Sequence, residues 1–390
     1  MTLWPSADQR SVDTAGHESK PLPAKRFRSG IGDKTVTLPL PPVDLLQLST
    51  MAPDTPLTAT PLPTIPLIDI GDAGPIALFE SERARADEIV RLGREQYGPK
   101  VIKFLDRVSQ LWAGYAGNPH VDEIRHIAEA MPRGIWFMNL CLEWACTSGV
   151  MEDPTAPGMR ILRTLDWPFH GLGRNLVIAR QDGPAGEFLN MTWPGFTGAV
   201  QGMAPRRFAL ALNQAPLVRR LTLPIYADWL INRIKVFSSK HIPPVFLLRR
   251  ALETCRNYAE ARDLLETTPI ALPAIFSLVG TQSGEGCVIE RLERRAVVHE
   301  APAAAANHWT GQTYRPGRPR GIESLRRHRL MNGYTHSHVS RFAWLTFPVL
   351  NEDTRLAMSA NPRAGELQVQ GFEADGAATE IFDLKERTAT

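Results

Sequence analysis

The pattern of apolar residues changes at Cys146, and this change constrains the fold more than any other feature of the chain. Before it, residues 79–115 carry apolar side chains at the spacing of an amphipathic helix, and residues 121–131 and 134–145 predict two shorter helices. After it, short apolar and β-branched runs alternate with turns that contain Gly, Pro or Asp. The sequence therefore predicts an α+β protein in which a helical segment precedes a strand-rich part.

The strand-rich part has an order of its own. We expect helices over 217–238 and 243–266, and strands over 159–165, 175–180, 187–192, 197–203, 208–213, 274–279, 286–291 and 296–299, with a last pair near 356–372 and 378–383. Strands, then two helices, then strands again predict sheets whose outer faces are covered by helices.

Residues 1–75 differ from both parts because they hold 12 of the 32 prolines. Proline removes a backbone donor and keeps the residue before it out of helical geometry. We therefore expect residues 1–75 to form an extended arm over the surface, docked through apolar residues near 62–70. The predicted organisation is this arm, a helical segment over 76–145 and the strand-rich part over 146–390.

Composition excludes several classes of protein. Hydrophobic residues make up 43% of the chain and charged residues 22%, which is typical of a globular protein. A net charge of only +3 argues against a dedicated nucleic-acid binder. Four cysteines are too few for a disulfide scaffold. No apolar run approaches 18 residues and no secretory signal is visible, so we expect no membrane span and a cytoplasmic location.

Cysteine chemistry is one interpretation of Cys146, which lies where the pattern changes. A thiol is a good nucleophile only as a thiolate, and a thiolate needs a nearby cation or base. Arg163 can supply the positive charge, and Asp166 can orient an amine. The alternative is a core cysteine beside a turn, since free cysteine is among the most buried residue types.

The remaining cysteines and the histidines give weaker signals. Cys141, Cys255 and Cys287 are expected in the core, because no pair of cysteines has the CxxC spacing of a metal site. His336 and His338 can share one face of a strand, but no third ligand is evident. We therefore expect no metal ion and no cofactor.

Several short motifs follow one another between residues 130 and 375 in an order that resembles a known family. They are Cys-Thr-Ser at 146–148, Arg-x-x-Asp at 163–166, GFTG at 195–198, GMAP at 202–205, NYAEARDLL at 257–265, QSGEGCVIER at 282–291, Asn-His-Trp at 307–309, Arg-Arg at 326–327 and FPVLN at 347–351. Together they resemble the acid ceramidase family, and more broadly the N-terminal-nucleophile (Ntn) cysteine hydrolases that include N-acylethanolamine amidase and bile-salt hydrolase.

The resemblance implies a fold and a processing step. The fold is a four-layer αββα Ntn-hydrolase sandwich over 146–390, the catalytic part, preceded by the arm and a helical pro-segment. Members of the family cut themselves before the cysteine, which here means the Ala145–Cys146 bond and an α/β heterodimer from one precursor. The cut would free the α-amine of Cys146, whose ordinary pKa of about 7.7–8 suits a general base at neutral pH.

The resemblance also implies the roles of four further residues. Asp166 would hold the amine, and Arg163 would steady the thiolate and the substrate carbonyl. Asn307, with Asn213 as its partner, would donate hydrogen bonds to the oxyanion, and one such donor is typically worth about 10²–10³ in rate.

Arg326 is the match to a last site arginine of the family, and Arg327, one residue away, is the alternative. Both belong to a basic cluster over 315–329, which we expect to be mostly a solvated loop, with transient contact to a membrane surface as the minority interpretation. Trp167, Trp193 and Gln214 are expected to contact substrate; Gln214 stands where acid ceramidases carry glutamate, which leaves substrate choice open.

The function implied is a self-processing amidase that hydrolyses the amide bond of a small N-acyl lipid through a Cys146 acyl-enzyme. Two alternatives stay open. The acyl-enzyme can pass its acyl group to an amine, as in related penicillin-acylating enzymes. The chain can also be an uncleaved, non-catalytic lipid-binding relative, in which Gln214 marks lost chemistry.

Overall fold

The computed structural model describes residues 61–115, 118–140, 144–216, 225–311, 317–337 and 342–385. The chain divides into two units, residues 1–61 and 62–390, and everything below concerns the second. Most of the predicted arm, residues 1–60, lies outside the described residues. The end of the arm forms strand β1, Leu67–Gly71, and the buried side chain of Ile65 packs into the core just before it.

Helices fill the segment before Cys146, and the stretch predicted to be helical over 79–115 falls within three of them. They are α1 (Gly74–Ser81), α2 (Arg83–Tyr97) and α3 (Pro99–Tyr115), followed by α4 (Val121–Glu129) and α5 (Ile135–Leu140). Gly98, at φ +82°, ends α2, and Pro99 opens α3, which is where each residue is favoured. The predicted helix over 134–145 ends early, because Ala145 already belongs to a strand.

The first sheet has eight strands among the described residues. In spatial order they are β1, β4 (Val177–Gly183), β5 (Gly186–Thr192), β6 (Gln201–Ala204), β7 (Phe208–Gln214), β8 (Ala274–Val279), β9 (Gly286–Arg291) and β10 (Ala296–Glu300). Neighbours are antiparallel except β1 and β4, which are parallel. The N-terminal segment therefore supplies one edge strand of this sheet.

The second sheet holds the strand that carries Cys146. Its order is β11 (Ala303–Ala305), β2 (Ala145–Glu152), β3 (Met159–Asp166), β12 (Thr354–Asn361), β13 (Glu366–Glu373) and β14 (Gly376–Ala377), with β15 (Phe382–Lys385) also paired to β13. The register sets Ala145 opposite Asp166 and Cys146 opposite Leu165. β2 and β3 face β7 and β8 of the first sheet, so Cys146 lies between the two sheets.

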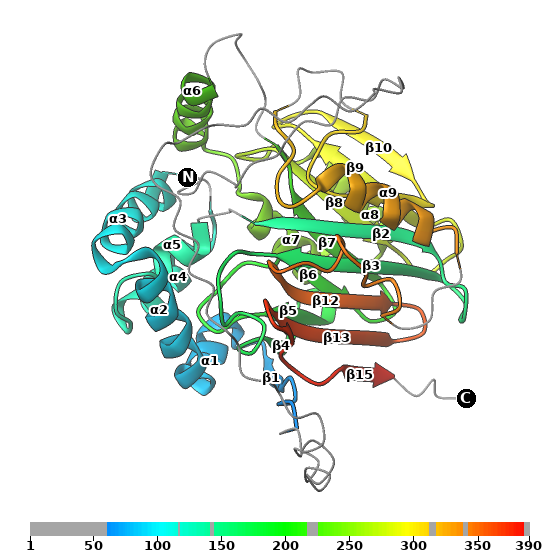
Figure 1. Cartoon of the computed structure of the whole chain (residues 1–390), viewed down its shortest axis with the longest axis horizontal. Coiled ribbons are helices and arrows are strands. Elements are labelled where there is room, and N and C mark those ends of the chain that lie inside the picture. The colour runs from blue at the N-terminus through cyan, green and yellow to red at the C-terminus, as the bar shows by residue number, and fades with distance from the viewer. Residues whose placement is uncertain are drawn as a thin grey trace, which may run out of the picture. The chain divides into compact units, whose positions relative to one another are not determined.

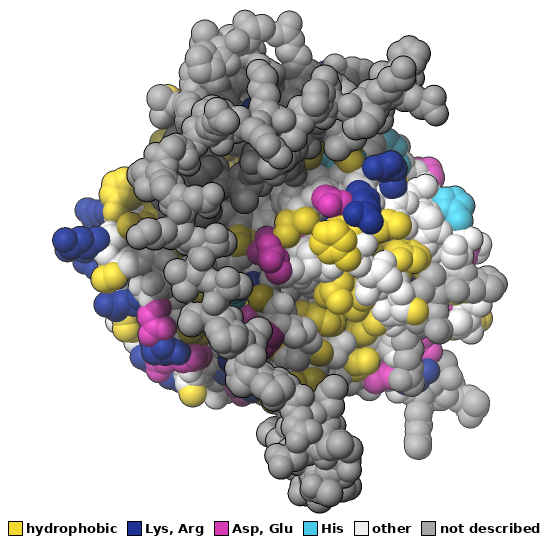
Figure 2. Space-filling view, in the orientation of Figure 1, with side chains coloured by type: hydrophobic (Ala, Val, Ile, Leu, Met, Phe, Trp, Pro, Cys, Tyr) yellow, Lys and Arg dark blue, Asp and Glu magenta, His cyan; other side chains and the backbone are white. Residues whose placement is uncertain are grey.

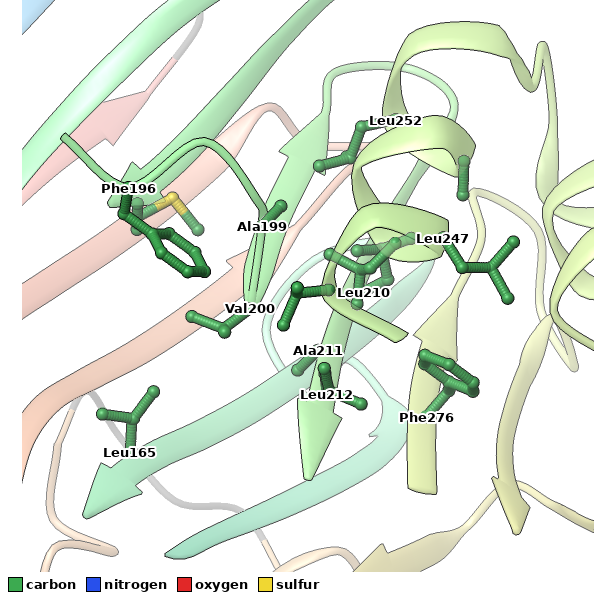
Figure 3. Packing of buried hydrophobic residues seen from close by; sticks show 14 of the residues in the cluster. Leu165, Phe196, Ala199, Val200, Leu210, Ala211, Leu212, Leu247, Leu252 and Phe276 are labelled. Carbon is green, nitrogen blue, oxygen red and sulfur yellow. The ribbon is translucent and has the colours of Figure 1, made fainter. Parts of the chain in front are cut away.

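Helices cover both outer faces of the sheet pair. α7 (Pro244–Thr254) and α8 (Tyr258–Thr267) lie on the first sheet, and α9 (Ser324–Tyr334) lies on β2 and β11 of the second (Figure 1). Figure 3 shows Leu247 and Leu252 of α7 packed with Leu210 of β7. The predicted four-layer αββα sandwich is confirmed, with α1–α5 grouped beside it.

Several predicted bounds were wrong. The helix expected over 243–266 is two helices, because Asn257 accepts a hydrogen bond from the Glu260 N–H at 2.9 Å and starts α8 anew. The helix expected over 217–238 is described only as α6, Ile225–Ser238, and the strand over 356–372 turns back on itself to form β12 and β13. Within the described residues, no helix is both long and apolar enough to cross a membrane.

Candidate active site

Cys146 is the second residue of β2 and is fully buried. Its Sγ–H donates to the Leu212 carbonyl of β7 at 3.6 Å, and its backbone N–H donates to Oδ1 of Asn307 at 2.7 Å. The Ala145–Cys146 peptide lies within β2, where both residues pair with β3. The nitrogen of that peptide is thus already held by a side chain from the loop after β11.

Arg163 of β3 brings a buried positive charge to the thiol. Its Nη1 donates to Oδ1 of Asn213 at 2.7 Å and its Nε to Oε1 of Gln201 at 3.4 Å. Nη2 is buried and has no hydrogen-bond partner among the described residues. Arg163 therefore keeps one donor available for another group in the site.

The thiol itself is held in its neutral form. Burial raises the pKa of the Cys146 thiol, and the nearby Arg163 and Arg327 guanidinium groups offset only part of this, while Asp166 adds to it. A thiol whose pKa lies above its ordinary range is protonated at neutral pH. The uncut chain therefore lacks a ready thiolate, and attack needs a base to take the proton.

Asp166 ends β3 directly opposite Ala145. Its Oδ1 accepts a hydrogen bond from Oγ1 of Thr354 at 2.9 Å, and its Oδ2 lies 3.5 Å from Nη1 of Arg327. Oδ2 is buried and accepts no hydrogen bond within the described residues. A buried carboxylate oxygen with unused accepting capacity lies beside the peptide that is predicted to be cut. Thr354 was not found from the sequence, because it is an ordinary strand residue far along the chain.

Asn307 and Gln214 hold the backbone on either side of that peptide. Oδ1 of Asn307 accepts from Cys146 and also from Nη2 of Arg327 at 3.0 Å, and two donors on one oxygen fix the orientation of the amide. Its Nδ2 donates to the Gln214 carbonyl at 2.8 Å, and Oε1 of Gln214 accepts the Trp144 N–H at 2.9 Å. In the uncut chain Gln214 therefore contacts the backbone of Trp144.

The two predicted oxyanion donors are engaged elsewhere in the uncut chain. Nδ2 of Asn307 is bound to Gln214, and Nδ2 of Asn213 donates to the carbonyls of Ala305 and Ala306, each at 3.3 Å. Both side chains lie in the site, as the sequence predicts, but the amide oxygens face the donors described above. Their role as oxyanion donors stays a prediction.

Arg327 takes the place that was predicted for Arg326. The side chain of Arg326 is 52% exposed and pairs with Glu323 at 3.0 Å on the outer side of α9. Arg327 is fully buried: Nη1 donates to the Cys146 carbonyl and, at 2.8 Å, to Oγ1 of Thr147. The prediction of Arg326 is wrong as to position, because one residue along a helix turns the side chain by about 100°.

The start of α9 also holds the backbone of Asn307. Oγ of Ser324 accepts the Asn307 N–H at 2.9 Å and lies 2.9 Å from Nδ1 of His308, whose ring is 5.2 Å from that of His328. Burial, with His328 and Arg327 close by, lowers the pKa of His308 to about 4. No pattern in the sequence points to Ser324, because α9 is basic and carries no apolar periodicity.

An apolar cavity of about 50 Å³ adjoins the site. The N-terminal helices and the residues after them contribute Ile89, Val90, Gly93, Tyr97, Ile102, Gly134, Phe137 and Met138, and the sandwich contributes Trp167, Phe169, Leu172, Trp193 and Phe196. The Trp144 ring, two residues before Cys146, lies 5.3 Å from that of Trp167. Trp167 and Trp193, predicted to contact substrate, thus line this cavity.

The other cysteines and the histidine pair add nothing to this site. Cys255 and Cys287 are buried, as predicted, whereas Cys141 and His338 fall outside the described residues. In the parts of the chain that the structure describes, no group of three His, Cys, Asp or Glu side chains could hold a metal ion. On the face shown in Figure 2, hydrophobic side chains gather over the second sheet; among the exposed residues, Phe347 lies under the Arg326 guanidinium at 5.6 Å.

The fold is the four-layer αββα sandwich that the resemblance implies, with Cys146 near the start of a strand of the second sheet. No family model matches the chain. The predicted resemblance in sequence is confirmed. Human acid ceramidase is 35% identical over 127 residues, which are 32% of this chain and 31% of that protein. The N-acylethanolamine-hydrolyzing acid amidase of Cavia porcellus is 26% identical over 254 residues, 60% of this chain and 68% of that protein.

Among solved structures, the chain is similar to an amidase and to an acylase. The Caenorhabditis elegans ortholog of N-acylethanolamine-hydrolyzing acid amidase is 18% identical with a TM-score of 0.43, over 61% of this chain and 99% of that one. Penicillin V acylase from Agrobacterium tumefaciens is 15% identical with a TM-score of 0.37, over 62% and 86%. The chain spans about a third of the human acid ceramidase and about half of the rat acid ceramidase, at 54%.

Proposed function

We propose that this chain is a self-processing cysteine amidase that hydrolyses the amide bond of N-acyl lipids. The observation that carries the proposal is the hydrogen bond from the Cys146 N–H to Asn307, because it singles out the nitrogen that becomes the catalytic amine. The similarity to acid ceramidases and to N-acylethanolamine-hydrolyzing acid amidases supports the substrate class. Cys146, Arg163, Asp166, Asn213, Asn307 and Arg327 form the proposed site.

Self-cleavage would proceed by transfer of an acyl group from nitrogen to sulfur. The Cys146 sulfur attacks the Ala145 carbonyl carbon, a C–S bond forms and the C–N bond breaks, and the thiol proton passes to the departing nitrogen. Water then hydrolyses the thioester, which leaves a carboxylate on Ala145, a free thiol and a free α-amine on Cys146. Asp166 lies opposite Ala145 with an unused acceptor oxygen, so it can hold the new ammonium group.

Turnover would then use the same atoms on an external amide. The α-amine takes the thiol proton, the sulfur attacks the substrate carbonyl, and the protonated amine gives the proton to the leaving nitrogen. Water, activated by the amine, releases the acid. Nη2 of Arg163, which is buried and has no hydrogen-bond partner among the described residues, would steady negative charge during these steps.

The apolar cavity fits the acyl part of such a substrate. It borders Trp167, and Trp144 of the pre-cleavage segment packs against that ring, so displacement of Trp144 would join the cavity to the thiol. A purely apolar lining gains free energy by burying methylene groups, at roughly 0.8 kcal/mol for each. Gln214 binds the Trp144 N–H in the uncut chain, and we assign it a substrate contact once that segment has moved.

Mass spectrometry and N-terminal sequencing of the purified protein test the proposal. Scaling 43.3 kDa over 390 residues, cleavage at Ala145–Cys146 gives fragments of about 16 and 27 kDa, and the larger should begin Cys-Thr-Ser. Cys146→Ala should remain one chain and hydrolyse no N-acyl amide, whereas Cys255→Ala should behave as the natural protein. An intact chain that is fully active, or an active Cys146→Ala variant, would overturn the proposal. Added free amine would divert product to a new amide if the enzyme is an acyltransferase.

A further inference from the structure

A buried ion pair joins the N-terminal helices to the catalytic sandwich. Arg249 of α7 is 5% exposed, and its Nη1 and Nη2 both donate to the Glu123 carboxylate of α4, the second at 3.0 Å. Its Nε donates to Glu253 of its own helix at 2.7 Å. Two parallel hydrogen bonds between a guanidinium and a carboxylate are among the strongest polar contacts in proteins. This contact crosses from the segment before Cys146 to the segment after it.

Thr197 is bound by both sides of this junction. Its carbonyl accepts from Nη1 of Arg249 at 2.8 Å, and its N–H and hydroxyl donate to Oδ1 of Asn139 at 2.7 and 3.0 Å. Nδ2 of Asn139 donates to the Gly195 carbonyl at 2.9 Å. The loop between β5 and β6 is thus fixed by α4, α5 and α7 together, and its Phe196 lines the apolar cavity.

The Glu123 carboxylate of this junction is held in its charged form. Burial acts to raise the pKa of Glu123, but hydrogen bonds from His120 and Arg249 outweigh it and lower the pKa to about 2. The groups that face the pair are His120 of the chain before α4, whose Nδ1 lies 3.5 Å from Glu123, and Glu253 of α7. Glu123 is therefore ionised over the whole range in which the protein is expected to be folded.

We propose that Glu123, Arg249 and Thr197 form a latch that keeps the N-terminal fragment bound to residues 146–390 after cleavage and holds Phe196 in the wall of the acyl cavity. This inference rests on the proposed function, since only cleavage makes two fragments. The partner is the fragment that ends at Ala145. It is a permanent subunit, because its helices supply about half of the cavity lining, including Ile89, Tyr97 and Phe137.

Glu123→Gln tests the latch, with Asp122→Asn as its matched control. Both lie in the first turn of α4 and both substitutions remove one negative charge, but the ion pair that the described residues give Asp122 is with Arg125 of its own helix. After mass spectrometry has shown complete cleavage, native mass spectrometry in rising salt measures how firmly the fragments associate. The natural protein and Asp122→Asn should stay paired, and Glu123→Gln should associate about 10–100-fold more weakly. Its KM for an N-acyl amide should rise more than its kcat falls.

Equal dissociation of Glu123→Gln and Asp122→Asn would overturn the latch. A chain that never cleaves would refute the proposed function instead. In that case, hydrogen exchange of the intact chain tests whether the ion pair holds the two segments together. There Glu123→Gln must speed exchange of the α4 amides and of Thr197 more than Asp122→Asn does. If exchange is unchanged, the ion pair does not hold the two parts together.

Discussion

The amide oxygen of Asn307 lies 2.7 Å from the backbone nitrogen of Cys146 and accepts its hydrogen bond, although 161 residues separate the two along the chain. Arg327 donates to the same oxygen and also to the Cys146 carbonyl. The polar contacts of the site therefore converge on the backbone of Cys146, while the sulfur donates to the Leu212 carbonyl and lies near the Arg163 guanidinium. This arrangement holds in place the nitrogen that the proposed cleavage would free.

Asn307→Ala should slow both self-cleavage and turnover by about 10²–10³, the usual cost of one positioned hydrogen-bonding group in an acyl-transfer site. The variant removes the acceptor of the Cys146 N–H and one partner of Arg327. Gel electrophoresis over time gives the cleavage rate, and Asn332→Ala, at an exposed position of α9, is the control. Cleavage of Asn307→Ala at the rate of this control would contradict the assignment.

Arg327→Leu and Arg326→Leu should differ sharply although the residues are adjacent. Arg327 is buried beside Asp166, and loss of one partner of a buried pair typically costs about 3–5 kcal/mol, so Arg327→Leu should unfold at much lower denaturant and fail to cleave. Arg326 pairs only at the surface, and its replacement should change the free energy of unfolding by less than about 0.5 kcal/mol. Urea titrations monitored by fluorescence measure the free energy of unfolding of both variants. Equal losses of stability would contradict the assignment of Arg327 as the site arginine.

Phe137→Ala should shift the acyl preference toward longer chains. Phe137 lines the cavity edge-on to Tyr97, with ring centroids 5.9 Å apart, and its removal makes room for two or more methylene groups. At roughly 0.8 kcal/mol per buried methylene, the ratio of kcat/KM for a longer over a shorter N-acyl amide should rise about tenfold. Phe347→Ala, at an exposed ring outside the cavity, should leave that ratio unchanged. A constant ratio in Phe137→Ala would mean that the acyl chain binds elsewhere.

His308 should make the protein less stable in acid. Its folded pKa of about 4 lies below the unfolded value of about 6.5, so the unfolded state binds more protons between these values. The free energy of unfolding therefore falls as the pH drops through that window, by up to about 3 kcal/mol from this group. His308→Asn should flatten the slope measured by urea unfolding between pH 7 and 4.

The pKa of His299 is shifted in the opposite direction to that of His308, so His299 serves as the control for this prediction. A hydrogen bond to Glu290 raises the pKa of His299, so this residue adds stability below its unfolded pKa and loses it as the pH rises. His299→Asn should therefore steepen the acid loss that His308→Asn relieves. Parallel slopes for the two variants would contradict the assigned environments.

Much of the fold could be predicted wherever a single pattern of apolar residues fills a whole element. The strands at 274–279 and 286–291 were predicted to the residue, because each is a short apolar run between clear turns. The points where one helix ends and the next begins were harder to predict. Asn257 and the Gly98–Pro99 step divide long helical stretches into separate helices. α9 was missed because it is held by buried arginine and serine contacts, and such contacts leave no hydrophobic period.

The part of the site that lies in ordered sequence motifs was predictable. Cys146, Arg163 and Asp166 come together because β2 and β3 are neighbouring antiparallel strands, and their spacing already suggests a hairpin. Which of two adjacent arginines turns inward depends on the phase of a helix that the sequence does not reveal. Contacts over long separations, such as Thr354 with Asp166 or Ser324 with Asn307, are set by the packing of whole layers.

Strand β1 comes from the segment before Cys146 but belongs to the first sheet of the sandwich. Residues 67–71 complete the first sheet by parallel pairing with β4, at an edge whose main-chain donors and acceptors would otherwise face solvent. A recombinant product that starts at Cys146 would present that open edge to any other chain and should precipitate or form strand-exchanged aggregates. Residues before Cys146 thus cover this edge while the sheet folds, and production of soluble, active material should depend on expressing them together with the rest of the chain.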